Sequence, residues 1–247
     1  MKNVFRRFLL SLAFLSFFLL ACTNNQSLNS NSAVNQRGKE RIAELNRSVF
    51  GISISVEGRD APKKFSIGTG FLVGENLIAS AFHVQTRSEE LGRKFAKNYK
   101  IVGWQKLKSG EFIEFPLEIA ADDKESDLIA YRFDDKMLKA NPNFADVKSL
   151  ALAESTPPIG EEVVSVGYYG DYKFPFNSIG NIAMIDANDD IFADLTLMSG
   201  NSVAPVCSLE TGAVVGVTTD VLEIGNASVR YGIAKSAVKL RTLLAKL

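Results

Sequence analysis

The sequence predicts an all-β fold, either a sandwich or a pair of barrels side by side, followed by a C-terminal helix. Ten short segments rich in Val, Ile, Phe and Tyr recur after residue 48, and turn residues separate them. About 200 residues follow the N-terminal leader, which is too many for one small barrel and suits two. No repeat of solenoid or propeller period is present. The predicted strands are 49–56, 68–79, 99–105, 112–119, 128–133, 163–168, 179–185, 191–196, 213–219 and 229–234.

Three stretches of the chain have helical patterning. Residues 39–45 and 88–97 are short amphipathic candidates. Residues 236–247 form the strongest one, because Ser236 is a suitable N-cap and most of the apolar residues fall on one stripe. The ten strands outnumber these helices, so the β pattern decides the fold class.

The composition excludes several classes of function. The 28 Lys and Arg residues balance 28 Asp and Glu residues, so no excess of positive charge favours nucleic acid as a partner. One histidine and two cysteines cannot form a zinc cluster of the usual His/Cys type, nor a disulfide framework. The sequence therefore predicts no metal and no nucleic-acid partner.

The first 21 residues have the pattern of a signal peptide. A basic start at Lys2, Arg6 and Arg7 precedes an apolar run over 8–20, which is too short for a bilayer-spanning helix of about 20 residues. The run ends in Leu-Leu-Ala-Cys, which resembles the bacterial lipobox. This resemblance implies cleavage before Cys22 and attachment of fatty acyl chains such as palmitate to it, and plain secretion is the alternative.

Residues 22–37 are predicted to be a flexible tether. They contain few charged or large apolar side chains, so they cannot bury enough surface to offset the entropy of ordering. Such a coil spans roughly 20 Å, enough to hold a domain clear of lipid headgroups. The predicted working domain is 38–247. Cleavage leaves 25 basic and 28 acidic residues, a net charge of −3, so the lipid and not the charge is expected to hold the protein at the membrane.

Three motifs along the predicted strands carry residues suited to hydrolysis. His83, the only histidine, follows the Gly-Thr-Gly-Phe-Leu-Val strand, and Asp127 immediately precedes the strand at 128–133. Ser202 lies on a tight Gly-Asn-Ser turn before another apolar strand. Each motif alone is weak, but the order His, Asp, Ser on an all-β chain is that of one lineage of serine hydrolases.

These residues and their flanks resemble the trypsin-like serine peptidases, most closely the bacterial high-temperature-requirement (Deg-type) proteases. Six segments match the family in register from about residue 48 to the C-terminus. They lie at 68–73, 126–132, 159–167, 200–202, 212–217 and 231–236. The chain ends after its predicted terminal helix, so no PDZ domain is expected.

The resemblance implies two six-stranded antiparallel β-barrels with the active site between them, and it implies a role for each matched residue. Ser202 is the expected nucleophile, His83 the general base and Asp127 the residue that orients His83. The backbone N–H groups of Gly200 and Ser202 are the expected oxyanion hole. Thr196 takes the place at the floor of the specificity pocket, which argues against cleavage after Lys or Arg.

The expected function is that of a membrane-anchored, extracytoplasmic serine endopeptidase of the cell envelope. Protein or peptide substrates are the expected partners, the membrane contact is through lipidated Cys22, and no cofactor is required.

Several alternatives remain open at this level. Asp122, Asp123, Asp134 and Asp135 are rivals to Asp127, although they lie in charge-rich turns where solvated carboxylates are common. Cys207 has the surroundings of a buried thiol.

Two positions depart from the family. Val203 replaces the usual Gly after the nucleophile, and Phe82 replaces the usual Ala before the histidine. Both add bulk near the reacting groups, so a degenerate protease fold that serves as a binding module is the alternative function.

Overall fold

The computed structural model describes residues 36, 38–56, 63–95, 98–107, 110–144, 147–168, 174–197, 203–224 and 229–247. The chain divides into two units, Met1–Arg41 and Ile42–Leu247, and the second contains every strand described below. Residues 38–48 are helical and lead into the first strand. In these described ranges no helix is both long and apolar enough to cross a membrane. The predicted signal peptide and Cys22 lie outside them.

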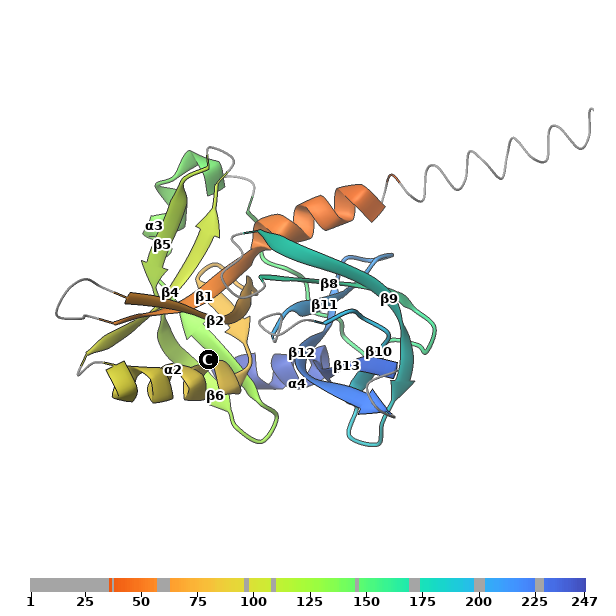
Figure 1. Cartoon of the computed structure of the whole chain (residues 1–247). Helices are drawn as coiled ribbons and strands as arrows, with labels where there is room; N and C mark the ends of the chain where they lie inside the picture. Colours follow the sequence, from red (N-terminus) through yellow and green to blue (C-terminus); the bar gives the residue numbers. More distant parts are fainter. Residues whose placement is uncertain are drawn as a thin grey trace, which may run out of the picture. The chain divides into compact units, whose positions relative to one another are not determined.

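The first half of the second unit is a curled antiparallel sheet in the order β5-β4-β1-β2-β3-β7-β6. Its two edge strands are consecutive in the sequence, and only Leu117 separates them. The Leu117 N–H donates to the carbonyl of Ile101 at 2.9 Å. Because one bent stretch supplies both edges, the sheet must curl round on itself (Figure 1). The strands are β1 (Val49–Val56), β2 (Lys63–Leu72), β3 (Leu77–Ser80), β4 (Tyr99–Lys106), β5 (Phe112–Pro116), β6 (Glu118–Asp123) and β7 (Leu128–Arg132).

The second half is a closed six-stranded barrel in the order β10-β13-β12-β11-β8-β9. Its strand pairs are antiparallel throughout the described residues. The strands are β8 (Glu162–Tyr168), β9 (Pro175–Ile185), β10 (Ile191–Ala193), β11 (Pro205–Ser208), β12 (Val214–Ile224) and β13 (Val229–Ser236).

The helices are few, as the sequence predicts. Helix α2 (Phe82–Phe95) follows β3, and α4 (Ala237–Leu244) ends the chain. A single turn, α3 (Lys136–Lys139), and a 3-10 turn at Pro142–Phe144 lie between the two sheets in the sequence. Helix α4 contacts β6 and β7 of the first sheet and β12 and β13 of the barrel, so it lies across both (Figure 1).

The prediction of an all-β fold with a C-terminal helix is confirmed. The curled sheet has seven strands in place of the expected six because Leu117 divides the predicted strand 112–119. Glu75 and Asn76 form a turn that splits the predicted strand 68–79 into β2 and β3. Helix α2 begins six residues earlier than expected, because tertiary hydrogen bonds satisfy its first N–H groups.

The two sheets share a core, which explains the apolar character of the strands between them. On β8, Val163 packs inside the barrel, whereas Val164 and Val166 pack in the cluster that includes the first sheet. Cys207 and Val217 belong to that shared cluster as well. Strands buried on both faces lose the alternation of half-buried strands, and the Val-rich runs of β8, β11 and β12 show this.

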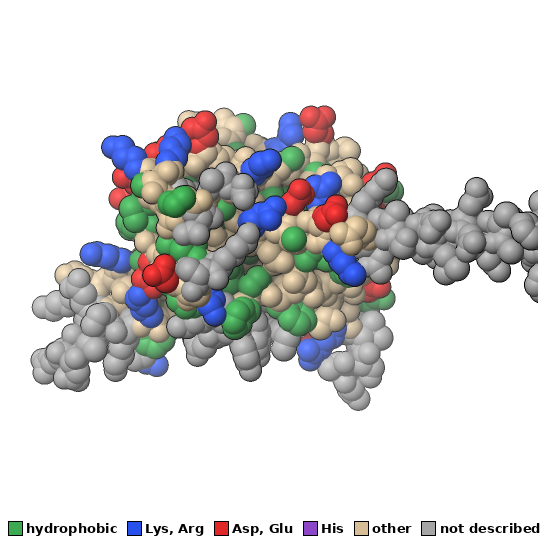
Figure 2. Space-filling model, turned by 90° about the horizontal axis from the view of Figure 1, so that it is seen from above, with side chains coloured by type: hydrophobic (Ala, Val, Ile, Leu, Met, Phe, Trp, Pro, Cys, Tyr) green, Lys and Arg blue, Asp and Glu red, His purple; other side chains and the backbone are tan. Residues whose placement is uncertain are grey.

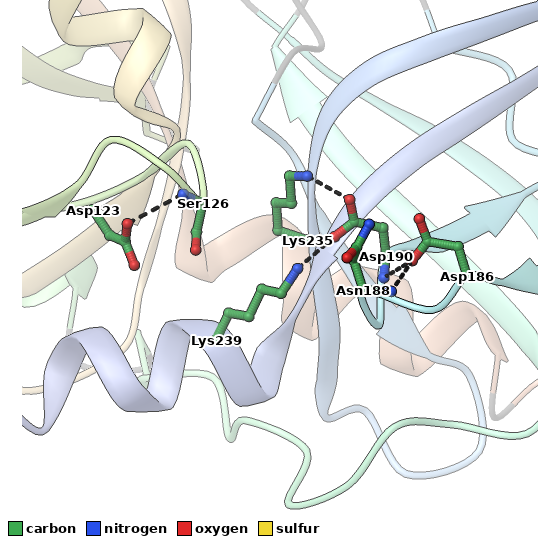
Figure 3. Close-up of polar contacts among 7 residues, drawn as sticks. All are labelled: Asp123, Ser126, Asp186, Asn188, Asp190, Lys235 and Lys239. Carbon is green, nitrogen blue, oxygen red and sulfur yellow. Dashed lines mark hydrogen bonds and ion pairs between the residues drawn. The ribbon is translucent and has the colours of Figure 1, made fainter.

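An ion cluster fixes α4 to the barrel. Asp190, which precedes β10, is bound by Lys235 of β13 and Lys239 of α4 (Figure 3). The Lys239 Nζ–Asp190 Oδ1 distance is 2.7 Å, and the Asp190 side chain is only 11% exposed. Asp186 accepts the N–H groups of Asn188 and Asp190, and these hydrogen bonds lower the pKa of the Asp186 carboxyl. Three elements thus meet at one carboxylate.

Ser236 occupies the N-cap position of α4, as predicted, but not in the expected manner. Its backbone is extended, with φ −62° and ψ 149°, and its hydroxyl makes no capping hydrogen bond. The hydroxyl is buried, and within the described residues it has no hydrogen-bond partner. The start of α4 therefore depends on packing by Ala237, Leu240 and Leu243, which are buried.

The surface carries charges of both signs. On the face shown in Figure 2, Lys and Arg side chains are interspersed with Asp and Glu among hydrophobic side chains. This face does not have the single-signed field that gathers a polyanion.

Candidate active site

His83 is the second residue of α2, immediately after the strand–helix junction that follows β3. Strand β3 pairs with β7, and Ser80 lies opposite Ile129. The end of β3 therefore lies beside the beginning of β7, where Asp127 is found. Antiparallel pairing brings together two residues that are 44 positions apart in the sequence.

Asp127 holds His83 through both of its carboxylate oxygens. Oδ1 accepts the backbone N–H of His83 at 2.8 Å, and Oδ2 lies 2.8 Å from Nδ1 of the imidazole. An ionised carboxylate only accepts hydrogen bonds, so Nδ1 must carry the proton. In the neutral ring Nε2 is then the basic nitrogen. The His83 side chain is 39% exposed, which leaves it accessible to a substrate.

The backbone of Asp127 is itself unusual. Its φ is 52°, in the left-handed region that Asp tolerates better than most residues. The Asp127 carbonyl accepts the Phe82 N–H at 3.1 Å, so the first two residues of α2 both bond to this aspartate. The carboxyl group of Asp127 thus lies at the N-terminus of a helix, a position in which acidic side chains are favoured.

The rival carboxylates have other roles in the described structure. Asp123 accepts the Ser126 N–H at 3.1 Å within the β6–β7 turn (Figure 3), and this hydrogen bond lowers the pKa of its carboxyl. Asp134 accepts the Lys136 N–H, Asp135 pairs with Lys139, and Asp122 is exposed. Asp127 is the carboxylate that contacts the His83 ring.

Ser202 and Gly200 lie outside the described residues, but Val203 is described. Its N–H donates to the Thr218 carbonyl at 2.8 Å, and its side chain is fully buried. Its φ is 87°, a conformation that suits glycine and strains a β-branched residue. Val203 therefore has the backbone conformation expected of the glycine it replaces.

We expect the Val203→Gly variant to be more stable than the Val203→Ala variant by about 1 kcal/mol. Both lose the buried isopropyl group, but only glycine relieves the cost of about 1–2 kcal/mol of a left-handed backbone. Urea unfolding of the two variants measures the difference. Val206 of β11, equally buried and not at positive φ, is the control. At position 206 the alanine variant should have the higher free energy of unfolding, by about 0.5–1 kcal/mol over the glycine variant. If the alanine variant were also the more stable one at position 203, the inference that Val203 has a strained backbone would be contradicted.

The family is identified by a match that spans these residues. The profile described as a trypsin-like peptidase domain matches residues 68–217, more than half of the chain. The chain belongs to the trypsin-like peptidases. His83, Asp127 and Ser202 all lie in the matched span, which is consistent with the motifs read from the sequence.

Two solved structures share the fold. The crystal structure of Deg5 matches with a TM-score of 0.62 at 16% identity, over 84% of this chain and 92% of that one. The serine endoprotease from Yersinia pestis matches with a TM-score of 0.60 at 15% identity, over 85% of this chain and 65% of that one. The predicted resemblance to Deg-type proteases is thus confirmed at the level of the fold. No curated protein sequence matches the chain.

Phe82, one of the two departures from the family pattern, precedes His83 at the start of α2. The ring is partly buried and packs against the core shared by the two sheets. Lys124 of the β6–β7 turn lies over its face, with Nζ 5.2 Å from the ring centroid. The extra bulk of Phe82 therefore contacts the core and the turn that carries Asp127.

Thr196 and Cys207, which the sequence analysis also singled out, both lie in the barrel of this trypsin-like fold. Thr196 is exposed after β10, and its N–H donates to the Ser178 hydroxyl of β9 at 2.7 Å. Cys207 is fully buried in β11, as expected of a structural thiol. Among the described side chains, no group of three or more His, Cys, Asp or Glu residues is placed to hold a metal ion.

Sequence reasoning missed the contacts that bind α2 to the rest of the site. The contact of Lys124 with Phe82 joins two residues 42 positions apart, and no sequence motif links the two. Similarly, the Tyr131 hydroxyl donates to Gln85 Oε1 at 3.4 Å, which links α2 to β7. The unusual Phe before the histidine was the one available signal.

Proposed function

We propose that this trypsin-like peptidase is a membrane-anchored, extracytoplasmic serine endopeptidase with a Ser202–His83–Asp127 triad. The observation that supports this most strongly is the double hydrogen bond from His83 to Asp127. A carboxylate in that position selects the Nδ1–H tautomer and stabilises the imidazolium that forms during acylation.

In the proposed mechanism, Nε2 of His83 removes the proton from Ser202 Oγ as that oxygen attacks the scissile carbonyl. The tetrahedral oxyanion receives hydrogen bonds from the N–H groups of Gly200 and Ser202. His83 then returns the proton to the leaving amine, and the acyl-enzyme forms. Water, activated by the same histidine, hydrolyses the ester and restores Ser202.

The edge of β12 is suited to hold a peptide substrate in an extended conformation. Its first part pairs with β11 and β13, but among the described residues only β13 pairs with 219–224. Val203, which follows Ser202 in the sequence, donates its N–H to the Thr218 carbonyl just before this edge, and this supports a position of the edge near Ser202. A peptide that adds to the edge as a strand would pass close to Ser202. Protein or peptide substrates are therefore the proposed partners.

A fluorophosphonate probe tests the chemistry. The purified full-length protein in detergent is expected to gain one phosphonyl adduct by intact mass, because an activated serine displaces fluoride from phosphorus. The Ser202→Ala variant is the control and should gain none. A folded wild-type protein that gains no adduct, or a Ser202→Ala variant that gains the same adduct, would contradict the proposal.

A specific observation supports a second candidate function. Val203 is buried and strained directly after Ser202, and a rotation of this peptide that relieved the strain would remove oxyanion stabilisation and leave a protease fold that only binds partners. The two functions differ in the effect of Ser202→Ala on the cellular phenotype. The change abolishes the phenotype if the protein acts as an enzyme and leaves it intact if it acts as a binding module.

The proposed anchor is the lipid on Cys22, since the leader ends in a lipobox-like motif. We expect the Cys22→Ala variant to lose incorporation of an alkyne-tagged palmitate and to keep its uncleaved leader, which intact mass detects. Cys207→Ala is the matched control, because that thiol is buried in β11. Incorporation of the tagged palmitate into the Cys22→Ala variant at the wild-type level would contradict lipid anchoring.

A further inference from the structure

The turn that carries Asp127 needs support, because the aspartate has a left-handed backbone with φ 52°. Within the turn, Asp123 accepts the Ser126 N–H at 3.1 Å, and the Asp127 N–H reaches the Lys124 carbonyl only at 3.4 Å (Figure 3 shows the first contact). The second bond is long, so the internal hydrogen bonds alone hold the turn weakly near Lys124.

The beginning of α2 supplies the remaining support. Phe82 and His83 donate their backbone N–H groups to Asp127, at 3.1 and 2.8 Å. The side chains add one more link, from the Lys124 ammonium to the face of Phe82 at 5.2 Å from its centroid. This distance lies within the range of a cation–π contact. The exposed lysine is thereby attached to a ring that packs against the core.

Displacement of this turn would act directly on the histidine. Both oxygens of Asp127 are used, one for the main chain of α2 and one for the imidazole. A shift at Lys124 that turns the carboxylate must therefore lengthen at least one of two 2.8 Å contacts. Hydrogen bonds weaken steeply as alignment is lost.

We propose that Phe82 and Lys124 are positioning residues, which together hold the Asp127 turn against α2 and so keep the carboxylate in register with His83. The consequence for catalysis rests on the proposed serine peptidase function. The geometric part does not, because the His83–Asp127 contact exists whether or not the protein hydrolyses peptides.

The chain offers an unusually clean probe, since His83 is its only histidine. Full-length protein labelled with ¹⁵N-histidine gives one imidazole spectrum, and the Nδ1–H proton reports its hydrogen bond to Asp127. We expect Lys124→Met and Phe82→Leu each to speed exchange of this proton with solvent about two- to fivefold, the factor that an exposed cation–π contact provides. The double variant should exchange no faster than either single variant.

Conservative substitutions distinguish a positioning role of the two residues from a general destabilisation of the fold. Lys124→Arg and Phe82→Tyr keep a cation and a ring, so both should restore the wild-type exchange rate. Lys100→Met changes an exposed lysine of β4 and is the matched control, for which no effect is expected. Lys124 is exposed, so the Lys124→Met variant tests the pair even if Phe82→Leu fails to fold.

Three results would overturn the inference. The first is that the Nδ1–H proton exchanges at the wild-type rate in both single variants. The second is that the two increases in exchange rate multiply in the double variant. The third is that the Nδ1–H proton of the wild-type protein exchanges too fast to be observed. Peptide hydrolysis adds a separate readout, in which kcat should fall about two- to fivefold with KM unchanged. If wild type and variants are all inactive, the proposed function fails, and the exchange rates still decide the role of the pair.

Discussion

The Asp127→Asn variant is expected to react with substrate or fluorophosphonate about 10⁴-fold more slowly than the wild-type protein. Asparagine keeps the size of the side chain and tolerates the left-handed backbone with φ 52°, so the fold should persist. Its single oxygen can accept the His83 backbone N–H, but its NH₂ group then faces Nδ1. Nδ1 must become the acceptor, and the proton moves to Nε2, where it blocks general-base action.

Two measurements check this result. Labelling kinetics give the rate, and the ¹⁵N shifts of the single histidine show which ring nitrogen carries the proton. Asp122→Asn is the matched control, because Asp122 is an exposed carboxylate of the neighbouring β6. The labelling rate of that variant should remain within about twofold of the wild-type rate, because surface substitutions usually have small effects. A tenfold or smaller loss in Asp127→Asn would show that Asp127 does not set the tautomer.

Replacement of Asp190 by asparagine should lower the free energy of unfolding by about 2–3 kcal/mol. Lys235 and Lys239 both bind this carboxylate, and their side chains are 20% and 27% exposed. Removing the shared anion leaves two neighbouring ammonium groups with no opposite charge between them. Since each lysine retains some exposure, the cost is less than the roughly 3–5 kcal/mol of a fully buried pair.

Urea unfolding of Asp190→Asn beside Lys239→Met provides the test. Lys239→Met leaves the Lys235–Asp190 pair in place, so its loss should be about 1 kcal/mol or less. The order of the two variants is the informative result. If both variants lost the same free energy of unfolding, the shared Asp190 carboxylate would contribute no more to stability than its single pair with Lys239.

The fold class and two residues of the site, His83 and Asp127, were predictable because they depend on local sequence patterns. The strands at 49–56 and 128–133 agree with β1 and β7 to within a residue, since β-branched residues and flanking turns mark their ends. His83 and Asp127 were selected by their positions relative to strands, and antiparallel pairing of β3 with β7 brought them together.

Other features have no local signal. The curled sheet contains β5 and β6 as separate edges, and Leu117 between them donates its N–H to the carbonyl of Ile101 on the neighbouring strand β4. The early start of α2 depends on hydrogen bonds to Asp127, and the cluster around Asp190 joins residues 45 and 49 positions apart. Such contacts form only when strand pairing and helix packing have brought these segments together.

The sequence by itself determined the all-β class, the candidate residues His83, Asp127 and Ser202, and the two departures from the family at Phe82 and Val203. It did so because strand, turn and motif preferences act over a few neighbouring residues. Only the tertiary structure decided that Asp127 binds His83 through both oxygens, that Val203 has a positive φ, and that Phe82 contacts Lys124. These features depend on the distance and direction between side chains on different elements, which strand pairing and core packing establish.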